Sequence, residues 1–195
     1  MLFSKPKYDY LIVGLGNPGD KYEQTRHNVG FRCIDTLCQS LSPTPEKQKF
    51  HAAICETQIK DKRVLLCKPL TFMNGSGTAV SEIVRFYKIP IDRVLVISDD
   101  CSLDAGRLRL RESGSHGGHN GLRDIIDLLG SDAFPRVKIG VGQKPHPEYD
   151  LADWVLGKPS KEDAEKIDKT VKDAAEAVKF TVTSSVRDAM NKFNR

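Results

Sequence analysis

The sequence predicts a three-layer α/β/α fold, in which helices cover both faces of a mixed central β-sheet. Strand-like and helix-like segments alternate along all 195 residues, with no repeat or linker between them. Tyr10–Leu15 and Arg93–Ser98 are rich in consecutive apolar residues, as expected for strands buried on both faces. Phe50–Ile59 and Arg63–Cys67 read as a hairpin, which makes a purely parallel sheet unlikely. The length favours a single domain over residues 1–195.

The helices are predicted from apolar residues spaced three and four apart. The first begins close to His27, and the second is ended by Pro90. Ser160 is the expected N-cap of the C-terminal helix, with Asp163 in the reciprocal position of a capping box. The expected helical ranges are 29–41, 79–87, 122–129 and 160–178.

Two further strands complete the predicted sheet. In residues 106–111, Leu108 and Leu110 alternate with arginines, so one face of that strand is expected to be buried and the other basic. Residues 137–141 form the last central strand.

Composition excludes disordered, fibrous and membrane-spanning classes. The chain is 39% hydrophobic and 29% charged, and its apolar runs fall far short of the roughly 20 residues that a bilayer crossing needs. The start of the chain, from Met1 to Lys7, has no apolar signal core, so we expect an intracellular, cytoplasmic protein. Five cysteines without a C-x-x-C pair are expected to be reduced core residues. A net charge of +4 permits a nucleic-acid or phosphate partner.

Gly14–Gly19 matches the G-x-G-x-x-G pattern of dinucleotide-binding proteins, but its context does not. Pro18 and further polar residues separate it from the first helix, and Asp35 falls inside that helix instead of at the end of a second strand. An NAD site is therefore rejected. Turn geometry explains the glycines, whereas Asn17, at the mouth of a buried strand, requires a functional explanation.

His27 and Asp99 form the candidate hydrolytic pair. His27 lies at a helix start, where the helix dipole disfavours the charged imidazolium. Asp99 follows a buried strand, and its carboxylate can orient the imidazole, whereas the neighbouring Asp100 is read as a turn residue. No G-x-S-x-G elbow supplies a nucleophile, and Cys101 is as readily a core residue, so activated water is the better candidate.

The loop His116–Gly121 is rich in glycine and runs into a predicted helix. Its two histidines, three residues apart, suggest a metal, but no H-E-x-x-H pattern accompanies them, so we expect none. Free backbone N–H groups at a helix start suit an anion instead. Arg111 and Lys138 can add the charge that a phosphate needs, although a solvated basic face is the alternative.

Three asparagines, Asn17, Asn74 and Asn120, fall at turns that are expected at one edge of the sheet. Their amides can hydrogen-bond a peptide-like group or an oxyanion. The chemistry indicated is attack of water on an acyl carbonyl in a molecule that carries phosphate.

With these residues in place, the sequence resembles the bacterial-type peptidyl-tRNA hydrolase family over nearly its whole length. The resemblance implies hydrolysis of the ester between a peptide and the 3′ end of tRNA, which recycles tRNA from stalled translation. It also implies a single mixed-sheet domain, a monomer, and no cofactor or metal. The blocks that carry it are Gly14–Gly19, Tyr22, Thr25–Gly30, Lys68–Gly77, His116–Gly121, Phe134–Gly142 and Val155–Gly157.

The resemblance also implies roles for residues around the base. His27 is similar to the family's general base, and Asp99 to the carboxylate that orients it. Asn17 resembles the residue that positions substrate and water. Asn74 and Asn120 resemble the amides that hold the peptide part and steady the attacking water or the oxyanion.

Other family positions concern the tRNA. Tyr22 resembles a contact for the terminal nucleotide, and Arg111 and Lys138 match a basic clamp on the 5′ phosphate. The chain departs from the family at 99–104, where an acidic pair is more often followed by a Leu-Asp-Leu-Pro-like turn; Asp99 itself is kept.

Two other functions stay open from the sequence. A related plant organelle group keeps this fold and acts as an RNA splicing cofactor, so the chain can in principle bind RNA without hydrolysis. A thiol hydrolase that uses Cys101 with His27 is the other alternative.

Overall fold

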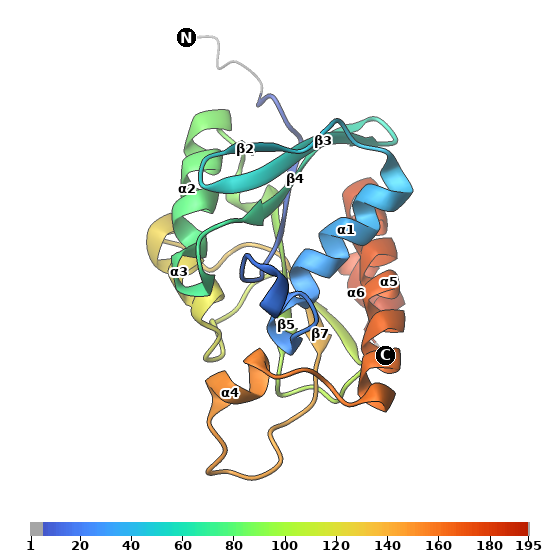
Figure 1. Cartoon of the computed structure of the whole chain (residues 1–195). Helices are drawn as coiled ribbons and strands as arrows, with labels where there is room; N and C mark the ends of the chain where they lie inside the picture. Colours follow the sequence, from blue (N-terminus) through green and yellow to red (C-terminus); the bar gives the residue numbers. More distant parts are fainter. Residues whose placement is uncertain (1–5, 195) are drawn as a thin grey trace.

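A mixed sheet runs through the centre of residues 6–194, the part of the chain that this computed structural model describes (Figure 1). Met1 and Lys5, on which part of the localisation argument depends, lie outside it. The strand order is β2-β3-β4-β1-β5-β7-β6, and β4, β1, β5 and β7 run parallel. The strands are β1 (Tyr10–Gly14), β2 (Lys47–Lys49), β3 (Ala52–Ile59), β4 (Lys62–Pro69), β5 (Val94–Asp100), β6 (Leu108–Arg111) and β7 (Arg136–Gly140).

Helices cover both faces of this sheet, which confirms the predicted α/β/α class. Figure 1 shows α1, α5 and α6 on one side and α2 and α3 on the other. The α-helices are α1 (Val29–Leu41), α2 (Ser76–Tyr87), α3 (Asn120–Leu129), α4 (Leu151–Leu156), α5 (Lys161–Thr183) and α6 (Val186–Phe193). The 3₁₀ turns are η1 (Asp20–Tyr22), η2 (Arg26–Asn28), η3 (Met73–Gly75) and η4 (Ile91–Arg93).

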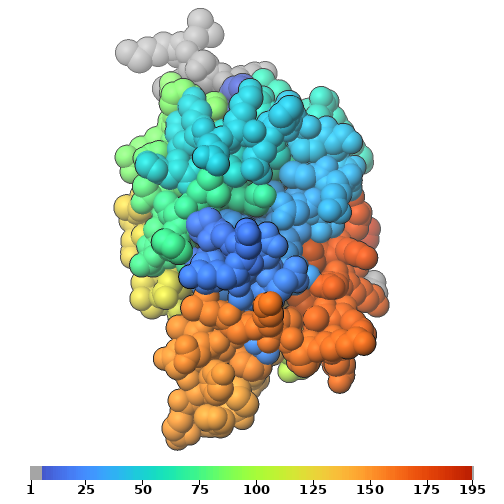
Figure 2. All heavy atoms as spheres, in the orientation of Figure 1, coloured from blue at the N-terminus to red at the C-terminus, as the bar shows by residue number. Residues whose placement is uncertain are grey.

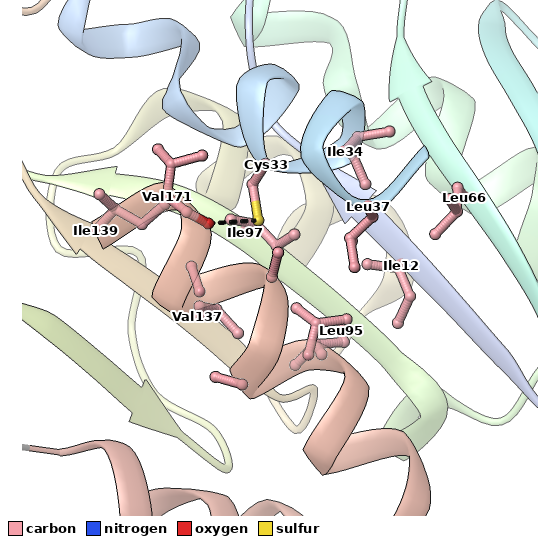
Figure 3. Close-up of a cluster of buried hydrophobic side chains, with 14 of the residues drawn as sticks. Ile12, Cys33, Ile34, Leu37, Leu66, Leu95, Ile97, Val137, Ile139 and Val171 are labelled. Atoms are coloured by element: carbon pink, nitrogen blue, oxygen red, sulfur yellow. Dashed lines mark hydrogen bonds between the residues drawn. The ribbon is translucent and has the colours of Figure 1, made fainter. Parts of the chain in front are cut away.

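The strand β1 is apolar throughout, and both of its faces are buried. Ile12 packs into the cluster under α1 and α5, whereas its neighbours Leu11 and Val13 pack into the cluster under α2 and α3. Figure 3 shows the first cluster, in which the thiol of Cys33 lies 3.8 Å from the carbonyl oxygen of Val171. The period-two burial of β6 is also as predicted, with its leucines buried and its arginines exposed.

A close approach of α1 to β1 brings the start of α1 to the sheet edge where the site forms. A Cβ on Gly14 would lie 2.2 Å from the carbonyl oxygen of Gly30, and a Cβ on Gly30 would lie 2.3 Å from the amide nitrogen of Leu15. Only glycine fits at both positions. The turn that holds His27 is thereby pressed against the carboxyl ends of the central strands.

The structure corrects the predicted start of the hairpin. Phe50 and His51 have φ values of 58° and 54°, in the left-handed region, so they form the turn between β2 and β3. The strand β3 therefore begins at Ala52. Ser160, in contrast, caps α5 as predicted, accepting a hydrogen bond from the N–H of Asp163 at 3.1 Å.

Three elements were not predicted. The edge strand β2 consists of exposed Lys47, Gln48 and Lys49, so no hydrophobic pattern marks it. The helix α4 has six residues, too few for a clear period, and α6 is a separate helix capped by Ser185. No helix among residues 6–194 is both long enough and apolar enough to cross a membrane.

Candidate active site

A cavity of about 590 Å³ opens at the carboxyl ends of the parallel strands. Figure 2 shows the orange segment that follows β7 and carries α4 below the blue connection between β1 and α1. The helix α4 supplies an apolar wall through Leu151, Val155 and Leu156. The sequence-predicted site residues that line this cavity are Asn17, Tyr22, His27, Asn74, Asp99, Asn120 and Lys138.

Two histidines share one oxygen of Asp99. His27 Nδ1 lies 2.7 Å from Asp99 Oδ1, and His119 Nε2 lies 3.0 Å from the same atom. The carboxylate is 4% exposed. Burial raises its pKa, but His27 and His119 outweigh burial and hold the pKa well below the usual 3.8. Asp99 is therefore an anion at neutral pH.

The hydrogen bonds assign the proton of each neutral imidazole ring. His119 is the N-cap of α3, and its Nδ1 accepts the N–H of Leu122 at 3.4 Å, so its Nε2 carries the proton and donates to Asp99. His27 donates from Nδ1 to the same carboxylate, which leaves its Nε2 with a free lone pair. His119 was not among the predicted site residues, although its place before a helix in a glycine-rich loop was a usable signal.

Burial and Asp99 shift the pKa of His27 in opposite directions. Burial lowers the pKa of His27, but the charge and hydrogen bond of Asp99 raise it more, so the pKa lies above the usual 6.5. The direction of the shift is therefore opposite to the one expected from the helix start. A free lone pair on a ring of raised pKa makes Nε2 a stronger base once it is deprotonated.

His27, Asp99 and His119 also offer atoms of the kind that bind metals, all within 4.8 Å of one another. The ring nitrogens that face Asp99 are at hydrogen-bond distance from it, and the other nitrogen of His119 accepts a backbone N–H. Hydrogen bonding thus accounts for the close approach of these three side chains without a metal ion. The absence of a metal requirement stays a prediction.

Asn17 is held in place by a reciprocal pair of hydrogen bonds. Its N–H donates to Asn28 Oδ1 at 2.9 Å, and Asn28 Nδ2 donates to its carbonyl oxygen at 2.9 Å. The side-chain oxygen of Asn17 accepts the N–H of Met73 at 2.8 Å, which fixes the orientation of the amide and leaves both N–H donors of its NH₂ group for a ligand. Asn28, which the sequence analysis did not single out, thus ties the His27 turn to the end of β1.

Arg26, on the other side of His27, ties the same turn to α4. Its guanidinium stacks 3.5 Å from the ring centroid of Trp154 and donates to the carbonyl oxygens of Trp154 at 3.2 Å and Lys158 at 3.0 Å. Trp154 Nε1 in turn donates to the carbonyl oxygen of Gly142 at 2.9 Å. These contacts hold the apolar wall of the cavity next to His27. Neither Arg26 nor Trp154 was singled out in the sequence.

The remaining predicted amides are exposed in the cavity. Asn74 lies in η3 and Asn120 begins α3, and neither side chain has a hydrogen-bond partner within residues 6–194. The ring of Tyr22 makes an edge contact with Phe72, with centroids 6.5 Å apart, and Phe72 is 61% exposed. A substrate can therefore meet free amides inside the cavity and aromatic rings at its mouth.

The two predicted phosphate ligands are placed differently. Lys138 lines the cavity and is bonded to Asp100 at 2.8 Å. Asp100 is the last residue of β5 and not a turn residue as expected; it accepts the N–H of Ser102 at 2.8 Å from the turn that follows, and it is also an ion-pair partner. Arg111 lies outside the cavity wall, exposed on β6. In the β6–β7 register, Arg109 lies directly opposite Lys138, and Arg111 is the diagonal neighbour of Lys138. Arg109 was not singled out in the sequence.

Cys101 lines the cavity as a protonated thiol. Burial and the nearby charge of Asp99 raise its pKa to about 12, so thiolate is scarce at neutral pH. This environment disfavours the thiol-hydrolase alternative.

An ionised carboxylate that orients a histidine, beside free amides and at the strand ends of an α/β sheet, is an arrangement typical of a hydrolytic enzyme. The comparisons with known proteins agree. The family model described as peptidyl-tRNA hydrolase matches residues 11–195, and the chain belongs to this family.

Individual relatives confirm the resemblance predicted from the motifs. A peptidyl-tRNA hydrolase from Clostridium perfringens is 50% identical over 184 residues, which cover 94% of this chain and 96% of the relative. One from Clostridium botulinum is 49% identical over 185 residues, covering 95% of each chain. The crystal structure of peptidyl-tRNA hydrolase from Acinetobacter baumannii is 38% identical, with a TM-score of 0.90, and the match covers 98% of this chain and 97% of that one.

Proposed function

We propose that this enzyme hydrolyses the ester bond between peptide and tRNA in peptidyl-tRNA, so that tRNA is recycled from stalled translation. The observation that carries the proposal is the 2.7 Å contact between His27 Nδ1 and Asp99, within a cavity lined by free amides. The proposal is also supported by the match of residues 11–195 to the peptidyl-tRNA hydrolase family.

In the proposed reaction, His27 Nε2 accepts a proton from a water molecule as the water oxygen attacks the ester carbonyl carbon. The negative charge that develops on the carbonyl oxygen is met by amide N–H donors. When the carbon–oxygen bond to the ribose breaks, the proton held by His27 passes to the leaving oxygen. The products are a peptide with a free carboxyl group and a tRNA with a free terminal hydroxyl.

The asparagines divide the remaining tasks. Asn17, whose side-chain oxygen accepts the N–H of Met73, positions substrate and water through its free NH₂ group. Asn74 and Asn120 hold the peptide bond and steady the water or the oxyanion. Tyr22 contacts the terminal nucleotide at the mouth of the cavity. No cofactor is needed for these steps.

Cleavage of N-blocked and unblocked aminoacyl-tRNA tests this function. Amides that bind a peptide bond should favour the blocked ester by at least about a hundredfold in kcat/KM, since the unblocked form brings an unpaired ammonium group to the site. Equal cleavage of both forms would mean that the amides do not read the peptide bond. Tight tRNA binding without cleavage of either form would favour the RNA-binding alternative.

We expect Arg111→Ala combined with Lys138→Ala to weaken tRNA binding about tenfold at moderate salt. The slope of log affinity against log salt should become shallower by roughly one to two, because fewer counterions are released. Affinity measured across a salt series checks this. Lys172→Ala, which removes an exposed charge from α5, is the control.

A substrate without the 5′ phosphate makes this test specific. If Arg111 and Lys138 clamp that phosphate, removing it should erase most of the difference between the double variant and the unmodified enzyme. An unchanged salt dependence in the double variant would remove both residues from the tRNA site.

Replacing Cys101 with alanine should leave most of the activity. The nucleophile is water in the proposed mechanism, and the Cys101 thiol is protonated at neutral pH. Steady-state cleavage of N-blocked aminoacyl-tRNA is the measurement. Near-complete loss of kcat in a folded variant would instead support a thiol mechanism.

We further propose that residues 1–195 act as one domain, as a monomer in the cytoplasm and without a membrane partner. Sedimentation of the purified protein, alone and with tRNA, tests the monomer.

A further inference from the structure

Two cysteines outside the active site lie in contact across the interface between α1 and β3. The Sγ atoms of Cys38 and Cys55 are 3.6 Å apart, although 17 positions separate them in the sequence. All five cysteines of the chain are free thiols. A disulfide bond is about 2.05 Å long, so the two sulfur atoms need to approach by only about 1.5 Å to form one.

The two thiols differ in access and in acidity. Cys38 is partly exposed, whereas Cys55 is 5% exposed. The Cys55 thiol can donate a hydrogen bond to a Cys38 thiolate. This bond, with the positive charge of Lys68, lowers the pKa of Cys38 against the opposing effects of burial and of the Asp35 and Glu46 carboxylates. The same hydrogen bond, together with burial, raises the pKa of Cys55.

The other three thiols are less reactive: two are buried, and the third, Cys101, is partly exposed like Cys38 but has a raised pKa. Cys33 and Cys67 are fully buried, and burial raises the pKa of Cys33 to about 12 and raises that of Cys67 as well. Burial also raises the pKa of Cys101 to about 12. Cys38 is therefore the thiol that an oxidant should reach first.

We propose that Cys38 and Cys55 form a reversible disulfide when the protein meets a hydroperoxide, and that this protects Cys38 from irreversible oxidation. The Cys38 thiolate attacks one peroxide oxygen, the O–O bond breaks, and Cys38 becomes a sulfenic acid; the hydroxide or alkoxide that leaves takes up from solvent the proton that the Cys38 thiol had released, and departs as water or an alcohol. The Cys55 sulfur then attacks the Cys38 sulfur, the S–O bond breaks, and the hydroxide leaves with the Cys55 proton as water. The thiols lose two electrons in total and the peroxide gains them; a small dithiol reductant reverses the bond.

The position of the pair determines what this bond should change. It joins α1 to β3 where they already touch, away from the cavity that begins at the other end of α1. Closing a covalent loop of this size stabilises the folded chain, so the oxidised protein should melt several degrees higher than the reduced one.

Peroxide treatment followed by thiol alkylation and peptide mass spectrometry tests the proposal. In the unmodified protein, dilute hydrogen peroxide should link the tryptic peptide 33–47 to the peptide 50–60, with loss of two hydrogens, and dithiothreitol should remove the link. Since peptide 33–47 also contains Cys33, fragmentation must place the bond on Cys38. In Cys55→Ser the sulfenic acid has no partner, so sulfinic acid on Cys38 should accumulate at least several-fold faster. Cys101→Ser, the matched control, should form the link as the unmodified protein does.

Absence of the Cys38–Cys55 link in the unmodified protein, or earlier oxidation of Cys101, would overturn the proposal. Equal rates of Cys38 sulfinic acid formation with and without Cys55 would overturn the protective role. The mapping of the unmodified protein decides whether the link forms even if Cys55→Ser does not fold.

Discussion

Replacing His27 with alanine should lower kcat for N-blocked aminoacyl-tRNA by about a thousandfold, the range expected when a general base is removed. Nε2 of His27 is the free basic atom of the hydrogen-bonded cluster, since its Nδ1 donates to Asp99 and both nitrogens of His119 are engaged. The affinity for tRNA should stay within about threefold, because the tRNA contacts proposed for Tyr22, Arg111 and Lys138 do not involve the base. Single-turnover cleavage and equilibrium binding of tRNA, measured on the same preparation, separate the two effects.

A matched histidine makes the result specific. His146 is exposed outside the cavity, where its ring contacts Tyr149, and His146→Ala should leave kcat unchanged. If His27→Ala keeps more than about a tenth of the activity, His27 is not the base. If it binds tRNA but both it and the unmodified enzyme fail to cleave, the residues of the site are relics and RNA binding is the function.

The second large effect is expected for Asp99→Asn. The amide keeps the shape of the carboxylate but removes the charge that two histidines share. The NH₂ group of the new asparagine can also face Nδ1 of His27. A donor in that place favours the tautomer of His27 that carries its proton on Nε2, and this tautomer cannot accept a proton from water. We expect kcat to fall by a hundredfold or more, and the pH profile to move as well.

The direction of that movement follows from the pKa of His27. Asp99 holds this pKa above 6.5 against the opposing effect of burial, and the base works only when neutral, so activity should decline as the pH falls through the raised pKa. Without the charge of Asp99, burial dominates and the pKa falls. The acidic limb of the kcat profile should therefore move to lower pH in Asp99→Asn. An acidic limb that stays in place would contradict the assignment of His27 and Asp99 as the acting pair.

The neighbouring carboxylate supplies the control. Asp100 accepts hydrogen bonds from Lys138 and Ser102, without a contact to His27 within the described residues, so Asp100→Asn should leave the acidic limb in place. It should affect the salt dependence of binding instead, because it releases Lys138 from its ion pair.

Stability should also respond to pH through this cluster, with opposite signs for its members. Asp99 has a lowered pKa, so its contribution is present above about pH 4 and is lost as the pH falls through the folded-state pKa. His27 has a raised pKa, so its contribution is complete below its unfolded value near 6.5 and is lost as the pH rises through the folded value.

Much of the architecture was predictable because local patterns carry it. The apolar runs of β1 and β5 indicate burial on both faces, and the alternation in β6 indicates burial on one face. Three elements could not be predicted from such patterns. The strand β2 forms by pairing with β3 and has no apolar residue, and α4 and α6 are short.

The candidate site was predictable to the level of most of the side chains that line the cavity, although His119 was missed. Asn17, Asn74 and Asn120 each sit where a strand or loop meets a helix, and strand ends meet at one edge of a sheet, so their shared cavity follows from topology. Arg111 was expected beside Lys138, and the register instead places Arg109 directly opposite it. The register of an antiparallel pair depends on both strands together, and one strand's pattern cannot supply it.

By itself, the sequence determined the fold class and the chemical groups of the site, because hydrophobic periodicity and side-chain chemistry are properties of each segment alone. Only the tertiary structure decided that His119 shares the Asp99 oxygen with His27, that Arg26 stacks on a tryptophan 128 positions away, and that two cysteines touch. Each of these contacts joins segments whose approach is set by how helices and sheet pack around a common core. The packing of helices and sheet depends on many residues at once, so the local sequence around one residue does not indicate which distant residue it contacts.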